Sequence, residues 1–183
     1  MNNTFRLKVL ENLKKSAFCI FIYEIVGSIR FDFKDHRIVS VSLVSLGNIF
    51  PDFIVFSKLR ALLWVAAGAH IDKVSTCTIR KGAYIEYAQN LSAGTNFHVG
   101  RNTYFCAHAP ITCGDHVTFS LNCMILTMHH SGEQHQNEHY SGVEIGEGSI
   151  IYAGAIILPG AVVTPKTVIK AGSVYTNQEY NNL

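Results

Sequence analysis

Aliphatic residues recur at every sixth position through the C-terminal part of the chain. The regular series is Ile145, Ile151, Ile157, Val163 and Ile169. A small residue stands four positions after each of them: Ser149, Ala155, Ala161, Thr167 and Ser173. One apolar position in six fits neither the period of an α-helix nor the alternation of a strand. The pattern is typical of a parallel β-helix, in which the chain turns a corner every six residues and the aliphatic residues point into a narrow prism.

The same period continues upstream with three interruptions. Inward positions are predicted at Ile79, Ile85, Ala93, Val99, Phe105, Cys113, Phe119 and Ile125. The gaps 85–93 and 105–113 are each eight residues long, so each holds a two-residue excess that we expect to bulge at a corner. The gap 125–145 is twenty residues long, and its segment 127–142 is too polar to pack inside a prism. We therefore expect 127–142 to be a loop ejected from the coil, and such insertions usually serve binding.

The first seventy residues do not follow the repeat. A helix is predicted over 5–29, with basic residues preceding a short apolar run that Glu24 interrupts. This run is too short for a transmembrane span, and no small-residue cleavage site follows it as in a signal peptide. A second helix is predicted over 58–67, with Ser57 as its N-cap and Gly68 after its end. Its apolar residues are expected to cover the open end of the first coil: Leu59, Leu62, Leu63, Val65 and Ala66.

The segment 30–56 is apolar, and the sequence assigns no element to it. We interpret it as part of a cap that packs on the β-helix and on a neighbouring copy, because apolar stretches of this length usually belong to a core. A surface that touches a membrane is the alternative. The predicted organisation is an N-terminal helical or irregular capping segment, 1–70, and a β-helix domain, 71–183, from which the loop 127–142 protrudes.

Composition supports a single globular protein. The chain of 183 residues is 48% hydrophobic and only 15% charged, which is more apolar than an isolated monomer needs, so we expect a symmetric oligomer. The net charge of +2 without a basic run gives no support to nucleic-acid binding. The five cysteines show no CxxC spacing and are expected to be buried free thiols in a reducing compartment.

The run 79–173 resembles the hexapeptide-repeat acyltransferases, which have a left-handed parallel β-helix. The resemblance is to the maltose/galactoside and exopolysaccharide O-acetyltransferase types, and it rests on the segments 59–64, 79–85, 109–115, 125–130 and 155–160. It implies an all-β solenoid with a helical cap that transfers an acetyl group from acetyl-CoA to a saccharide acceptor, in surface polysaccharide or lipid-linked oligosaccharide assembly. It also implies a cytoplasmic homotrimer with active sites between subunits; peripheral membrane contact through the N-terminal segment stays open.

The resemblance places the general base of this family at His130, with His129 as the second candidate. A sugar hydroxyl is a poor nucleophile at neutral pH, and imidazole, with an unperturbed pKa near ~6.5, is suited to accept its proton. The acetyl group then passes directly, without a covalent enzyme intermediate. Asn102, Met128 and Ser131 fall at acceptor-binding positions. Asn102 is explained equally well as a corner asparagine that tolerates a left-handed backbone conformation.

For acetyl-CoA, the resemblance implies small residues at coil corners against which the pantetheine arm lies, with a backbone amide on the thioester oxygen. These residues are Gly154, Ala155, Ala171, Gly172 and Ser173. Residues 176–178 stand where the family usually has Thr-Lys-Asp, so Lys170 or Lys166 is expected to contact the 3′-phosphate of CoA instead.

No metal site is predicted. Five further histidines are interpreted as solvent-facing residues of corners and of the loop: His98, His108, His116, His135 and His139. Two alternative functions remain open at this point. One is a non-catalytic β-helix that serves as a scaffold or binding protein, and the other is a metal-dependent hydratase of the carbonic-anhydrase type with the same fold.

Overall fold

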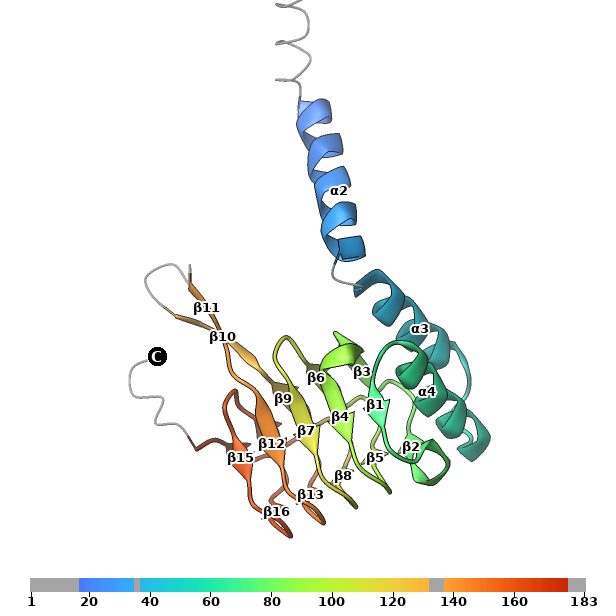
Figure 1. Cartoon of the computed structure of the whole chain (residues 1–183), viewed down its shortest axis with the longest axis vertical. Helices are drawn as coiled ribbons and strands as arrows, with labels where there is room; N and C mark the ends of the chain where they lie inside the picture. The colour runs from blue at the N-terminus through green and yellow to red at the C-terminus, as the bar shows by residue number, and fades with distance from the viewer. Residues whose placement is uncertain (1–16, 35–36, 132–136, 178–183) are drawn as a thin grey trace, which may run out of the picture. The chain divides into compact units, whose positions relative to one another are not determined.

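The computed structural model describes residues 17–34, 37–131 and 137–177 (Figure 1). Contacts divide the chain into two compact units, residues 1–38 and 39–183. The first contains helix α2 (Ala17–Lys34), which continues beyond the predicted end at Ile29; the rest of that predicted helix, 5–16, lies outside the described residues. Within the described part of the chain, none of the helices has the length and apolarity needed to cross a membrane.

Three five-stranded parallel sheets form the walls of a prism in the second unit (Figure 1). Sheet 1 contains β1 (His70–Ile71), β4 (Leu91–Ala93), β7 (Ile111–Cys113), β12 (Val143–Ile145) and β15 (Val162–Val163). Sheet 2 contains β2 (Thr78–Ile79), β5 (His98–Val99), β8 (Thr118–Phe119), β13 (Ile150–Ile151) and β16 (Val168–Ile169). Sheet 3 contains β3 (Tyr84–Glu86), β6 (Tyr104–Cys106), β9 (Met124–Leu126), β14 (Ile156–Ile157) and β17 (Val174–Tyr175). The expected β-solenoid is confirmed, and its short parallel strands agree with the expected left-handed β-helix.

Every inward position predicted between Ile79 and Ile169 is buried, which confirms the six-residue period as the origin of the core. Three phenylalanines on neighbouring coils fill the prism with edge-to-face contacts, since the ring centroids of Phe105 and Phe119 lie 5.1 Å apart and those of Phe97 and Phe119 lie 6.0 Å apart.

Three corners connect the sheets. The first follows sheet 1, the second follows sheet 2 (residues 80–83, 100–103, 120–123, 152–155 and 170–173), and the third follows sheet 3 (residues 87–90, 107–110, 127–142 and 158–161). The three interruptions of the repeat all fall at the third corner. The two-residue excesses occupy 87–90 and 107–110, as expected from the gap lengths.

The long insertion forms an antiparallel hairpin of β10 (Met128–Ser131) and β11 (Asn137–Tyr140) (Figure 1). Thr127, predicted as the first residue of the loop, is instead fully buried at its base. Its hydroxyl donates to the Cys106 carbonyl at 2.6 Å and accepts from the Ala109 amide at 2.9 Å. Thr127 therefore ties the hairpin to the preceding coil.

Helix α4 (Ile54–Ala66) covers the first coil, but its start and its buried face differ from the prediction. Ser57 lies inside the helix, where its hydroxyl donates to the Ile54 carbonyl at 2.6 Å, so it is not the N-cap. The buried residues are Ser57, Arg60, Ala61 and Trp64, at the spacing of one helix face. Trp64 packs edge-on against Phe105, with ring centroids 5.6 Å apart.

The five apolar residues expected to cover the coil therefore lie elsewhere on α4. Leu62, Val65 and Ala66 are exposed, and Leu59 and Leu63 are only half-buried. The face that α4 turns inward therefore combines polar, small and aromatic residues, and its aliphatic residues remain wholly or partly at the surface.

Helix α3 (Arg37–Ile49), which the sequence left unassigned, lies beside α4 through a buried arginine. The Arg60 Nε donates to the Gly47 carbonyl at 3.0 Å, and its Nη2 donates to the carbonyls of Phe50 and Pro51 at 2.7 and 2.9 Å. These bonds fix the link between α3 and α4, which places Asp52 against the coils.

Candidate functional site

The second corner contains most of the residues predicted to bind substrates, stacked from coil to coil. Gly82, Asn102, Asn122, Gly154 and Gly172 each adopt a positive φ there, between 53° and 80°. Backbone hydrogen bonds connect successive turns: the Asn102 amide donates to the Lys81 carbonyl, Asn122 to Arg101, Gly154 to Leu121 and Gly172 to Ala153. The corner is therefore a continuous edge on which the predicted acceptor residue and the predicted cofactor residues lie in one line.

Asn102 has the left-handed backbone that a corner asparagine requires, with φ 53°. Its side chain is nevertheless exposed, and it lines a cavity of about 490 Å³ at the helix-capped end of the corner. A side chain at Gly82 would collide with the Asn102 amide oxygen, so the glycine leaves room for that amide. The conformational role of Asn102 is confirmed, and its proposed contact with the acceptor stays a prediction.

The same cavity is lined by charged residues that the sequence did not single out. Asp52 accepts hydrogen bonds from Nε and Nη2 of Arg80 at 2.9 and 2.8 Å, from the Lys81 amide at 3.2 Å, and from Nε of Arg101. The Arg80 guanidinium is the main cause that holds the pKa of Asp52 far below its usual range. Asp52 therefore remains ionised within a cluster of guanidinium groups.

The predicted cofactor residues lie further along the second corner. Ala155 is fully buried, whereas Ala171 and Gly172 are exposed and Ser173 is half-buried. A Cβ at Gly172 would meet nothing within 4 Å, and one at Gly154 would touch only Gly172 at 3.9 Å. The edge is thus open at this point, as a thin extended ligand would need.

The histidines of the predicted catalytic segment lie on the hairpin. In β10, Met128, His129 and His130 pair with Tyr140, His139 and Glu138 of β11. The rings of His129 and His139 stack at 5.2 Å, so His139 belongs to the hairpin structure. The His130 side chain is exposed, and Ser131 pairs with Asn137 at the end of the described part of β10. His135 lies outside the described residues.

Glu138 is a candidate functional residue that sequence reasoning missed. It stands directly opposite His130 across the hairpin, where side chains of paired residues lie on the same face. It also accepts a hydrogen bond from the Tyr140 hydroxyl. Glu138 could have been identified only from the register of the hairpin, and the polar sequence of the loop does not specify that register.

His108, interpreted from the sequence as solvent-facing, is instead half-buried at the base of the hairpin. Its Nε2 lies 3.1 Å from a carboxylate oxygen of Glu86, whose other oxygen accepts from the Tyr104 hydroxyl at 2.8 Å. The His108 ring also stacks on Tyr140 at 5.9 Å. Among the described residues, Glu86, Cys106 and His108 form one group with ligating atoms within 4.8 Å of one another.

His98 is also half-buried, and its Nδ1 lies 2.7 Å from the Thr78 hydroxyl. Burial lowers the pKa of His98. His116 is an exposed corner residue with φ 57°, in agreement with its interpretation from the sequence.

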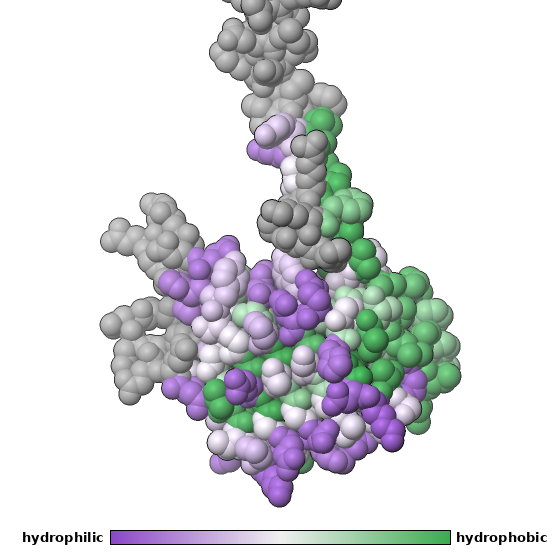
Figure 2. All heavy atoms as spheres, in the orientation of Figure 1, coloured by the Kyte–Doolittle hydropathy of each residue, from purple (hydrophilic) through white to green (hydrophobic). Residues whose placement is uncertain are grey.

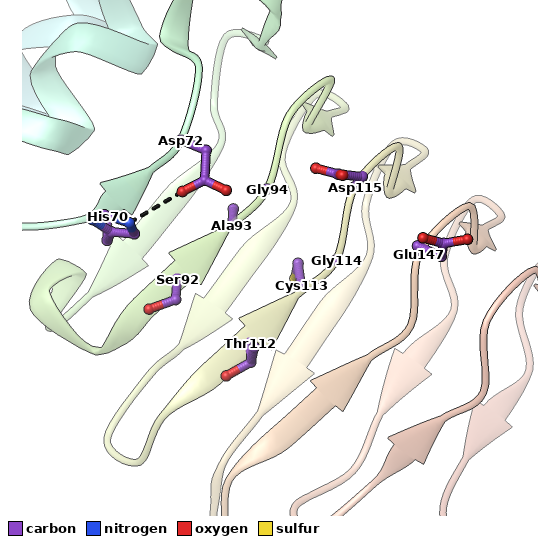
Figure 3. A pocket seen from close by; sticks show the side chains of 10 residues that line it. All are labelled: His70, Asp72, Ser92, Ala93, Gly94, Thr112, Cys113, Gly114, Asp115 and Glu147. Carbon is purple, nitrogen blue, oxygen red and sulfur yellow. Dashed lines mark hydrogen bonds and ion pairs between the residues drawn. The ribbon is translucent and has the colours of Figure 1, made fainter.

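A shallow cavity of about 400 Å³ lies on sheet 1, away from all the predicted site residues (Figure 3). Figure 3 shows the carboxylates of Asp72, Asp115 and Glu147 on three coils along its edge. The amide and hydroxyl of Thr95 donate to Asp115 and lower the pKa of that carboxyl. Thr95 and Asp115 therefore link two neighbouring coils at this face.

Within one chain, the structure does not bring all the predicted residues together. Asn102 and the cofactor residues lie on the second corner, whereas His129 and His130 extend from the third, and the strands of sheet 3 separate the two corners. A site that uses both sets needs the second corner of one copy to face the hairpin of another.

Comparison with known proteins gives structural neighbours only: no protein-family model matches the chain, and no curated protein matches it. A maltose O-acetyltransferase from Clostridium difficile 630 is 26% identical, with a TM-score of 0.67 over 77% of this chain and 75% of that chain. A galactoside acetyltransferase in complex with coenzyme A is 21% identical, with a TM-score of 0.70 over 79% and 72% of the two chains.

A hexapeptide-repeat-containing acetyltransferase from Vibrio cholerae O1 biovar eltor, complexed with acetyl coenzyme A, is 21% identical, with a TM-score of 0.69 over 79% and 78% of the two chains. The resemblance to hexapeptide-repeat acetyltransferases is thereby confirmed at the level of the fold.

Proposed function

We propose that this chain is an acetyl-CoA-dependent O-acetyltransferase that acts on a sugar hydroxyl in the assembly of surface polysaccharide or lipid-linked oligosaccharide. The observation that carries the proposal is the exposed His130 on a hairpin at the side of a β-helix shared with sugar acetyltransferases. Two of the neighbouring structures contain acetyl coenzyme A or coenzyme A, so the fold accommodates this donor.

The reaction needs one base and one site for the thioester. An imidazole nitrogen of His130 takes the proton of the acceptor hydroxyl as its oxygen attacks the thioester carbonyl. The tetrahedral intermediate collapses, the C–S bond breaks, and the sulfur of CoA takes the proton back from the imidazolium. Glu138, opposite His130, is placed to stabilise the imidazolium while the proton is held there.

The second corner supplies the binding surface in this proposal. The open edge at Gly154 and Gly172 accepts the pantetheine arm, with Ala155, Ala171 and Ser173 beside it. Lys170, exposed at the same end of the corner, is placed for a phosphate of CoA. Asn102, two coils from Gly154, holds the acceptor, and Met128 contacts the acceptor from the hairpin.

A homotrimer with active sites between subunits fits this arrangement. The hairpin and the second corner lie at opposite ends of the strands of sheet 3. Around a three-fold axis, the hairpin of one copy can therefore face the second corner of the next copy, so that each site takes residues from two copies. We place the protein in the cytoplasm, where acetyl-CoA is available; the buried free thiols of Cys77, Cys106, Cys113 and Cys123 suit such a reducing compartment.

The test is CoA release from acetyl-CoA in the presence of a panel of sugar acceptors, followed with a thiol reagent. We expect acceptor-dependent release that falls by about 10²–10⁴-fold in His130→Ala, the usual contribution of a general base. His116→Asn, which removes an exposed imidazole of the first corner and tolerates its φ of 57°, is the control and should leave the rate unchanged. If the wild-type protein binds no CoA, the chain is a non-catalytic scaffold instead.

A further inference from the structure

The cavity at the start of the second corner has a net positive charge, because Lys81 and Arg101 line it together with the single carboxylate of Asp52. Arg60, Arg80 and Arg101 surround the single carboxylate of Asp52, at 3.8 Å for the closest Arg60 contact and 2.8 Å for that of Arg80. Of these three arginines, only Arg101 lines the cavity itself. Two positive charges against one negative charge leave the lining with a net positive charge, and the two further guanidinium groups on Asp52 add to it, although no such excess is visible in the +2 of the whole chain.

The basic groups retain hydrogen-bonding capacity toward a ligand. Among the described residues, the Nε of Arg101 is occupied by Asp52, while its two terminal nitrogens and the ammonium of Lys81 make no hydrogen bond. Asp52 holds Arg101 through Nε, so the two terminal nitrogens of this cavity-lining residue stay available to a ligand. A planar guanidinium edge beside an ammonium group is an arrangement that suits phosphate.

Exposed apolar residues directly flank the cavity. Ile49 precedes Pro51 and Asp52 and is 74% exposed, and Phe53, Ile54 and Val55 follow them with exposures of 64%, 75% and 66%. The rings of Phe50 and Phe56 stack at 5.0 Å and hold this turn in shape. Figure 2 shows the apolar surface gathered over α3 and α4. Exposed apolar residues this close together mark an interaction surface rather than ordinary scatter.

We propose that the cavity binds the phosphate of a lipid-linked saccharide, whose lipid lies on the apolar residues 49 and 53–55 and whose sugar extends along the second corner past Asn102. The positive charge of the cavity lies beside exposed apolar residues. A lipid phosphate matches both features, whereas an apolar protein partner would leave the positive charge without a counterpart. The proposal deepens the function proposed above and rests on it for the reaction, but its claim about binding stands separately.

The position of the cavity agrees with the reaction geometry. Asn102 and Gly154 are two coils apart, about 10 Å at the usual spacing of neighbouring strands, and a saccharide can span this distance. A phosphate held by Lys81 and Arg101 therefore leaves the sugar between the Asn102 amide and the edge where the thioester would lie.

The test is binding of the full chain to phosphatidylcholine vesicles that contain either a polyisoprenyl phosphate or the corresponding polyisoprenol, measured by flotation. We expect binding at least about tenfold tighter to the phosphate-containing vesicles, because a charge-assisted bidentate contact has this magnitude. The double variant Lys81→Gln/Arg101→Gln should lose the difference. Lys73→Gln, which removes one exposed positive charge outside the cavity, should retain it.

Three results would overturn the proposal. Equal binding to the phosphate and the alcohol would exclude a phosphate site. Equal binding to phosphatidylglycerol vesicles of matched charge would reduce the cavity to a general anionic-membrane contact. Two results together would exclude the lipid. Soluble glucose 1-phosphate would compete as effectively as the lipid-linked phosphate, and the variant Phe53→Ser/Ile54→Ser would bind the vesicles as wild type does.

Failure of the proposed function would look different. His130→Ala should bind the polyisoprenyl phosphate vesicles as wild type does, since the hairpin is not part of the cavity. A chain that binds these vesicles but never releases CoA from acetyl-CoA would contradict the acetyltransferase reaction and leave the phosphate site standing. Circular dichroism and thermal unfolding of each variant show that loss of binding is not loss of fold.

Discussion

Asn102 combines a backbone requirement with an exposed amide, and the two can be separated by one substitution. Glycine adopts the positive φ of this corner without strain, so Asn102→Gly removes the amide while the corner keeps its shape. We expect kcat/KM for the acceptor to fall by about 10- to 100-fold, the loss of one or two hydrogen bonds to substrate, with thermal stability nearly unchanged.

The matched control is Asn122→Gly on the next coil, where the backbone has φ 57° and no contact with the acceptor is proposed. Its kinetics should equal those of wild type. If both variants lose activity equally, or if Asn102→Gly keeps full activity, Asn102 is a corner residue without a role in acceptor binding.

From the hydrogen bonds of Asp52 we expect the free energy of unfolding to depend on pH. Its folded-state pKa is lowered chiefly by the hydrogen bonds from Arg80, so the ionised carboxylate stabilises the fold. This contribution is fully present above the pKa of about 3.9 of an unfolded aspartate and is lost as the pH falls below it. Asp52→Asn should therefore lower the free energy of unfolding by about 2 kcal/mol at pH 7.

Urea unfolding of wild type and Asp52→Asn between pH 7 and pH 3 measures this difference, which should shrink as the solution becomes acidic. A difference that stays constant over the range would show that the carboxylate charge does not hold the α3–α4 link. The cluster itself was not predictable from the sequence, because Asp52 meets Arg80 and Arg101 across 28 and 49 positions of the chain.

At the scale of elements, Trp64 is the residue through which α4 closes the prism. It is 1% exposed and packs edge-on against Phe105. Trp64→Ala should lower the free energy of unfolding by about 3–5 kcal/mol, the usual cost of removing a large buried aromatic side chain. Leu62→Ala, on the exposed face of the same helix, is expected to change it by less than about 0.5 kcal/mol. Chemical denaturation compares the two; equal effects would mean that α4 does not cap the coil.

The coils were predictable from the sequence because they repeat one pattern, whereas the helices of the cap follow no repeat and were predicted only in part. Each coil imposes the same demand on its residues, so Ile79 and Ile169 obey one rule although they lie at opposite ends of the prism. The cap occurs once, and its buried face is decided by contacts with the first coils rather than by a repeating pattern. Ser57 and Arg60 are accommodated there because the Ser57 hydroxyl and the Nε and Nη2 of Arg60 donate to backbone carbonyls, which hydrophobicity alone does not reveal.

The hairpin shows the same limit at its own scale. Its polarity predicted that 127–142 leaves the coil, since a polar segment cannot fill the prism. The pairing of His130 with Glu138 could not be predicted, because neither strand alternates apolar and polar residues in a way that fixes a register.

For the whole molecule, the proposal requires more than one copy of the chain. Sheet 3 keeps the hairpin of a chain apart from its own second corner, so a complete site takes His130 from one copy and Asn102 from another. In solution, the mass of the assembly should be about three times the 20.3 kDa of one chain, as for a closed three-fold ring.

The most direct test of this account is the activity of mixed assemblies of two variants that are each strongly impaired. His130→Ala and Asn102→Gly chains carrying different tags are co-expressed, assemblies that contain both are purified, and CoA release is measured with the best acceptor. If sites lie between copies, each mixed trimer has one site in three that receives both intact residues, so the purified mixed assemblies should recover about a third of wild-type activity. Mixed assemblies as inactive as either variant alone would contradict the account.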